Sequence, residues 1–153
     1  MAASISTLDD KTLQRSLAAE RFSLLGCALD VASQCPRYRE ASFGEVSNMI
    51  SCAIMNQQMK CYFNTMGRPV GLLLWAWVTE DVLTRLTNEA TFPPSLHQSE
   101  WQEGKIPFVV DLVSLPHTYT FKAMVADAKN FFRSERRLAW INWQTRRLRS
   151  LQR

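Results

Sequence analysis

The chain has 153 residues, of which 46% are apolar and 21% are charged, so it can bury the core of one domain and is not a disordered chain. Its net charge is +4, with the arginines concentrated after residue 132. The longest apolar run, residues 70–78, is far shorter than the roughly 20 residues of a membrane span, so we expect no stable membrane insertion. We expect a single domain over residues 1–153, with flexible ends at 1–7 and 146–153.

The cysteines and the N-terminus bear on metals and on location. Cys27, Cys35, Cys52 and Cys61 lack the C-x-x-C spacing of zinc sites, and both histidines lie far from them in the sequence, so we expect no bound metal. The segment MAASISTLDDKTL has no basic stretch followed by an apolar run, which is the pattern of a secretion signal. We therefore expect a cytoplasmic protein with reduced thiols.

Two helices are predicted in the first third of the chain. Residues 7–34 show leucines near helical spacing, with Thr7 as the N-cap, and we expect Pro36 to close this helix. The second helix runs from about Phe43 to Asn56, and its apolar side chains form one stripe that faces the core.

The hydrophobic period then changes to that of strands. The segments MKCYFN and PVGLLLWAWV, joined by a turn that contains Gly67, predict a hairpin. After it we expect a helix at TEDVLTRLTNEA, a loop that contains SEWQEGK, a strand at IPFVVDLVSL, a helix at FKAMVADAKNFFRSE and a strand at RRLAWINW. This order predicts an α+β sandwich around a mixed sheet.

Asp111 is the one carboxylate in the apolar run IPFVVDLVSL. Burying an unpaired carboxylate costs several kcal/mol, so the side chain needs partners. Either the strand reaches an edge there, or Asp111 pairs with an arginine, or it orients a catalytic group.

Four segments together resemble the RTX toxin-activating lysine acyltransferases: LGCALDVASQCPRY, RPVGLLLWAW, SEWQEGK and IPFVVDLVSLP. The resemblance covers roughly residues 25–143 and keeps the family's order and spacing. It implies a fold similar to the GNAT acetyltransferases and the transfer of a fatty acyl group from acyl-carrier protein to internal lysines of a protoxin. It also implies a catalytic histidine and aspartate, and the aspartate corresponds to Asp111.

Tyr38 stands where the family has its histidine. A histidine with a pKa of about 6.5 suits proton removal from an amine near neutral pH, whereas a tyrosine with a pKa of about 10 stays protonated there. Tyr38 is therefore a poor base, and two other roles stay open: proton donation to the departing thiolate, or positioning of the carbonyl. A neighbouring Arg37 or Arg39 would lower the pKa of Tyr38 by favouring the phenolate.

Three other residues are alternatives for the chemistry. Cys35 lies where the family tends to have a serine, and arginines beside it would favour a thiolate that accepts the acyl group, although a lone cysteine is more often an inert apolar side chain. His97 lies in the loop before Trp101, and His117 lies beyond the strand of Asp111. Sequence spacing does not decide between them.

We expect an acyl-carrier-protein-dependent protein lysine acyltransferase, with acyl-carrier protein as co-substrate, no bound cofactor and a protein or peptide acceptor. A homodimer is one of the oligomeric states that the sequence leaves open. Carrier proteins are acidic, so basic residues are candidates for donor binding: Arg133, Arg136, Arg137, Arg146, Arg147 and Arg149. The tail has few aromatic residues among its arginines, so we expect no nucleic acid partner. The alternative is a catalytically silent relative that acts as a binding or regulatory module.

Overall fold

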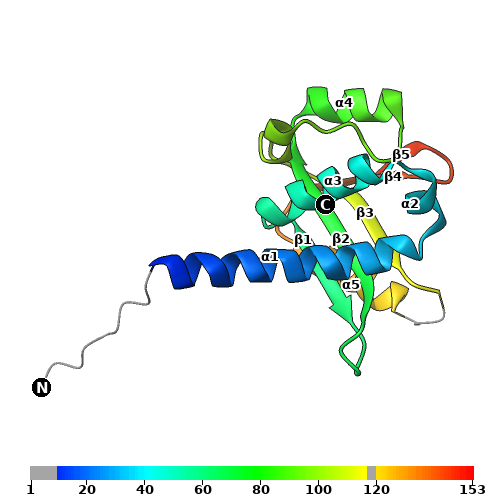
Figure 1. The fold of residues 1–153 in the computed structure, drawn as a ribbon. Coiled ribbons are helices and arrows are strands. Elements are labelled where there is room, and N and C mark those ends of the chain that lie inside the picture. Colours follow the sequence, from blue (N-terminus) through cyan, green and yellow to red (C-terminus); the bar gives the residue numbers. More distant parts are fainter. Residues whose placement is uncertain (1–9, 117–119) are drawn as a thin grey trace, which may run out of the picture.

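The computed structural model describes residues 10–116 and 120–153, and Figure 1 shows an α+β arrangement as expected. In chain order its elements are α1 (Asp10–Ser33), α2 (Pro36–Glu40), α3 (Phe43–Met55), β1 (Met59–Phe63), β2 (Pro69–Val78), α4 (Glu80–Glu89), η1 (Gln98–Trp101), β3 (Ile106–Ser114), α5 (Phe121–Phe131), β4 (Arg137–Asn142) and β5 (Arg147–Gln152).

The five strands form one mixed sheet in the order β1-β2-β3-β4-β5, in which only β3 and β4 run parallel. Helices cover both of its faces (Figure 1). The larger apolar cluster lies between the sheet and α1, α2 and α3, and a smaller cluster lies on the opposite face with α5. No helix among residues 10–116 and 120–153 is long and apolar enough to span a membrane.

Two predictions at the ends of elements differ from the structure. Pro36 closes α1 as expected but also opens α2, because its ring fits the first turn of a helix, where no N–H is needed. Residues 147–152 form β5 instead of the flexible end expected for 146–153. Leu148 and Leu151 on opposite faces of β5 each cover one of the two apolar clusters, so both faces of this edge strand gain burial. Residues 1–7, the other expected flexible end, lie outside the described residues.

An irregularity in the β2–β3 ladder decides where Asp111 points. Leu74 pairs with Asp111 but the next residue, Trp75, pairs with Val109, so Val110 is an extra residue in β3. In a regular strand Asp111 would share the α5 face with Val109. The bulge turns it to the face of Leu74, which is the face of α2.

The loop between η1 and β3 holds the end of β2. Trp101 is buried, and its carbonyl accepts a hydrogen bond from Gln58 Nε2 at 3.0 Å. Three residues later the N–H of Gly104 donates to the Trp77 carbonyl at 2.9 Å. A Cβ at Gly104 would lie 1.9 Å from the carbonyl atoms of Val78, so only glycine fits this approach of backbone to backbone.

Candidate active site

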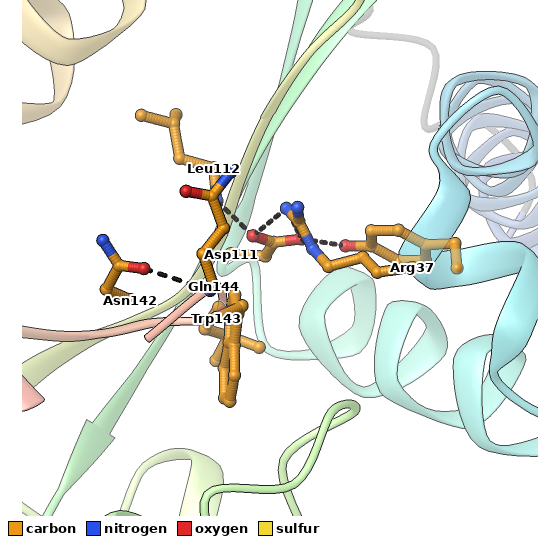
Figure 2. A network of polar contacts seen from close by, with 8 residues as sticks. Arg37, Asp111, Leu112, Asn142, Trp143 and Gln144 are labelled. Atoms are coloured by element: carbon orange, nitrogen blue, oxygen red, sulfur yellow. Dashed lines mark hydrogen bonds and ion pairs between the residues drawn. The ribbon is translucent and has the colours of Figure 1, made fainter. Parts of the chain in front are cut away.

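The short helix α2 brings two side chains to Asp111 (Figure 2). Arg37 Nη2 donates to both carboxylate oxygens, at 2.6 Å to Oδ1 and 2.8 Å to Oδ2, and Arg37 Nε lies 3.3 Å from Oδ2. The Tyr38 hydroxyl donates to Oδ2 at 2.7 Å. Of the three alternatives expected for Asp111, pairing with an arginine is therefore confirmed, and Tyr38 contacts the same carboxylate.

Asp111 is buried, with 3% of its side chain exposed, and its carboxylate is fully supplied with donors. Besides Arg37 and Tyr38, the backbone N–H of Leu112 donates to Oδ1 at 2.9 Å. The burial of Arg37 opposes its charge, but the attraction and hydrogen bonds of Asp111 outweigh that effect and raise the pKa of the guanidinium. The pair is thus a buried carboxylate held by a cation, and both carboxylate oxygens accept hydrogen bonds.

Tyr38 is a neutral phenol in this arrangement. Burial and the negative charge of Asp111 raise its pKa well above the usual 10, and the opposing effect of Arg37 is smaller. Arg37 therefore lowers the pKa of Tyr38 as expected, but burial and Asp111 have the larger effect, so the pKa is raised. The ring is 4% exposed and packs edge-on against Phe92 with a centroid distance of 4.9 Å.

A cavity of about 590 Å³ opens beside this cluster. The parallel ladder between β3 and β4 pairs Phe108 with Ala139 and Val109 with Trp140, and it stops at the bulge. Arg37 and Asp111 line the cavity at this gap in the sheet. Most of its remaining wall is apolar and comes from the α5 side: Leu73, Val109, Val125, Ala128, Leu138 and Trp140.

The last residue of β4 and the two residues after it line the polar end of the cavity, and Figure 2 shows their side chains. Trp143 spans the gap between the strands, since its Nε1 donates to the Val110 carbonyl at 3.2 Å. The side chain of Asn142 accepts a hydrogen bond from the backbone N–H of Gln144 at 3.0 Å, which fixes the turn into β5. Asn142, Trp143 and Gln144 thus form a polar rim near the ion pair.

Of the other predicted catalytic residues, the structure describes Cys35 and His97, and neither donates a hydrogen bond to Asp111. Cys35 precedes α2, packs partly against the core and lies near enough to Arg37 and Tyr38 to influence their pKa values. Its role as an acyl acceptor stays a prediction. His97 is exposed at the start of η1 and does not line the cavity, and His117 lies outside the described residues. In the described part of the chain no three His, Cys, Asp or Glu side chains are grouped to hold a metal ion.

The arginines predicted to bind the donor divide into groups. Arg147 and Arg149 pair with Asn142 and Trp140 across β5 and β4, so they are exposed on the sheet face that carries the cavity. Arg137 is less available to bind the donor, because its Nη1 forms an ion pair with Glu80 at 2.6 Å. The other three are exposed: Arg133, Arg136 and Arg146.

The sequence reasoning missed Arg37 as a site residue in its own right. The sequence points to Arg37 only as a neighbour of Tyr38. A signal was present, because a buried Asp111 needs a partner and Arg37 is adjacent to the predicted catalytic position. The polar rim at Asn142, Trp143 and Gln144 was also missed, since nothing in its sequence separates it from an ordinary turn.

A mixed sheet that opens beside a buried carboxylate, with helices on both faces, is consistent with a GNAT-like acyltransferase fold. The model of the RTX toxin acyltransferase family matches residues 17–151, most of the chain, and the chain therefore belongs to that family. No curated protein matches the chain.

Proposed function

We propose that this protein transfers a fatty acyl group from acyl-carrier protein to a lysine amine of a protein, with an RTX protoxin as the kind of acceptor. The observation that carries the proposal is the cavity of about 590 Å³ that ends at the Arg37–Asp111 pair. Its volume lies within the range of about 300 to 1,000 Å³ that is usual for small-molecule sites. An apolar cavity with a polar end suits an acyl chain that carries a thioester.

The apolar wall supplies affinity for the acyl chain. Each methylene that leaves water for this wall contributes about 0.8 kcal/mol. The donor is a thioester on the carrier protein, so the reaction needs no other cofactor. Arg147 and Arg149, exposed on the same sheet face, support the approach of an acidic carrier, and this attraction weakens as salt is added.

The hydrogen bonds of Asp111 and the protonated phenol of Tyr38 determine how the transfer step proceeds. The lysine nitrogen, as the neutral amine, forms a bond to the thioester carbonyl carbon, the C–S bond breaks and the carrier thiolate leaves. The proton of the nitrogen passes to solvent, because the Asp111 carboxylate is engaged by Arg37 and Tyr38, and Tyr38 holds its own proton. In this proposal Asp111 and Tyr38 are positioning residues that hold Arg37 at the end of the cavity.

The second candidate function is a catalytically silent relative that binds a carrier or a toxin without modifying it. The observation that favours it is Tyr38, whose pKa is raised well above its usual value, so that Tyr38 itself is no base near neutral pH. A silent protein would bind acyl-carrier protein and release it unchanged.

One experiment separates the two functions. The protein is incubated with acyl-carrier protein that carries an alkyne-labelled fatty acid and with an RTX protoxin that contains candidate lysines, and the acceptor is then analysed by mass spectrometry. We expect a labelled lysine amide that is absent without the protein. Binding of the charged carrier without any labelled amide, over a pH range from 7 to 9, would support the silent relative.

A further inference from the structure

Arg37 has donors that its pairing with Asp111 leaves unused. A guanidinium carries five N–H groups, and the hydrogen bonds of Arg37 involve only its Nε and Nη2. Nη1 donates to no group among the described residues, yet about a third of the side chain, 34%, is exposed and Arg37 lines the cavity. Two charged donors thus remain at the end of an apolar cavity.

The guanidinium is also held in place. Asp111 fixes one edge through a bidentate contact, and the ring of Phe92 lies 5.3 Å from the central carbon. Asp111 is in turn held by the Tyr38 hydroxyl and the Leu112 N–H. A donor fixed in this way needs no rearrangement when charge develops near it.

We propose that Nη1 of Arg37 is the oxyanion donor of the acyl transfer. This inference rests on the proposed function. When the amine attacks the thioester, the electron pair of the C=O bond moves onto oxygen, and an N–H of Nη1 donates to this oxygen until the C–S bond breaks and the carbonyl re-forms. Arg37 thereby becomes the residue that touches the reacting atoms, with Asp111 and Tyr38 behind it.

The opposing explanation is that Arg37 only neutralises Asp111. The variant Arg37→Lys separates the two, because an ammonium keeps the charge beside Asp111 but has no second planar edge to donate from. An oxyanion donor predicts a loss of about 10² to 10³ in kcat, with little change in KM for acyl-carrier protein. Unchanged kcat would overturn the inference. Arg39→Lys, an exposed arginine on the same helix, is the matched control and should leave kcat unchanged.

A second measurement reports contact with the carbonyl directly. An unreactive ketone analogue of acyl pantetheine, with sulfur replaced by CH₂ and a ¹³C-labelled carbonyl, is bound to the wild type and to Arg37→Lys. The infrared C=O band should lie at lower frequency in the wild type, because a charged donor polarises the bond. Equal band positions in the two proteins would overturn the role of Arg37 even if kcat had fallen.

The outcomes also separate this inference from the function on which it rests. If the analogue binds and the wild type transfers acyl groups to lysine, but the two band positions are equal, then only the oxyanion role of Arg37 is refuted. If the analogue does not bind and no acyl group is transferred, both the oxyanion role of Arg37 and the proposed function are refuted. If Arg37→Lys does not fold, the double variant Arg37→Leu with Asp111→Asn, which removes both charges together, takes its place in the infrared comparison.

Discussion

Tyr38→Phe tests whether Tyr38 transfers a proton or holds Asp111. The replacement keeps the ring and its edge-on contact with Phe92 and removes only the hydroxyl that donates to Asp111 at 2.7 Å. Asp111 keeps Arg37 and the Leu112 N–H. The change therefore deletes one buried hydrogen bond to a charged group.

Such a bond contributes about 1.5 to 3 kcal/mol to stability. For a chain of 153 residues, about 2 to 4 °C of melting temperature corresponds to 1 kcal/mol, so we expect the melting temperature to fall by about 3 to 12 °C. A residue that only holds Asp111 should cost less than about tenfold in the rate of acyl transfer, whereas positioned proton transfer contributes about 10² to 10⁴.

The assay is thermal unfolding together with single-turnover transfer from acyl-carrier protein. Tyr62→Phe is a matched control, because the Tyr62 hydroxyl also donates to a carboxylate, Asp127, at 2.6 Å but in a half-exposed place. Water replaces that bond, so we expect a smaller fall in melting temperature. A Tyr38→Phe variant with an unchanged melting temperature and a rate more than about 10² lower would refute the reasoning and make Tyr38 the proton donor.

Three further predictions concern pH, the donor and the fold. The raised pKa of Tyr38 keeps it protonated up to pH 10, so it is no base for the lysine. The transfer rate should therefore rise about tenfold per pH unit from 6.5 to 9 as the lysine amine deprotonates, and a plateau near pH 7 would reveal a base. Reversing Arg147 and Arg149 to Glu should raise KM for acyl-carrier protein more than the same reversal at exposed arginines elsewhere, Arg15 and Arg68, when KM is measured at low salt. Gly104→Ala should lower the melting temperature by several degrees, because its Cβ would meet backbone at 1.9 Å, whereas Gly26→Ala in α1 meets no atom within 4 Å and should not lower it.

The elements of this fold were largely predictable, because local patterns produce them. Helical spacing marked α1 and α3, and the apolar runs at residues 69–78 and 106–114 marked the central strands. The strand β5 was not predicted, since its exposed arginines resemble a solvated tail and only two leucines show which faces are buried. An edge strand with so little burial leaves a weak hydrophobic pattern.

Asp111 and Tyr38 were predictable members of the candidate site, but Arg37 and the chemistry of the site were not. Asp111 stood out because a lone carboxylate in an apolar strand needs a partner, and the resemblance indicated Tyr38. The bulge at Val110 leaves no mark in the alternation of IPFVVDLVSL, yet it decides the face on which Asp111 lies. The contact of Arg37 with Asp111 joins residues 74 positions apart, which spacing alone does not show.

The ion pair gives a physical reason for a tyrosine at position 38. A histidine there would lie beside both Asp111 and the Arg37 guanidinium, and the cation would disfavour the imidazolium that a histidine base has to form. A phenol forms no cation, and its hydroxyl donates its one proton to Asp111 in a hydrogen bond. Arg37 and Tyr38 therefore fit together as one arrangement, in which the carboxylate binds the guanidinium instead of orienting a base. In the proposed mechanism, catalysis then relies on positioning and on charge stabilisation at the carbonyl. This arrangement predicts that Tyr38→His alone does not reproduce the mechanism of the family, because Arg37 remains on the carboxylate that a histidine would need.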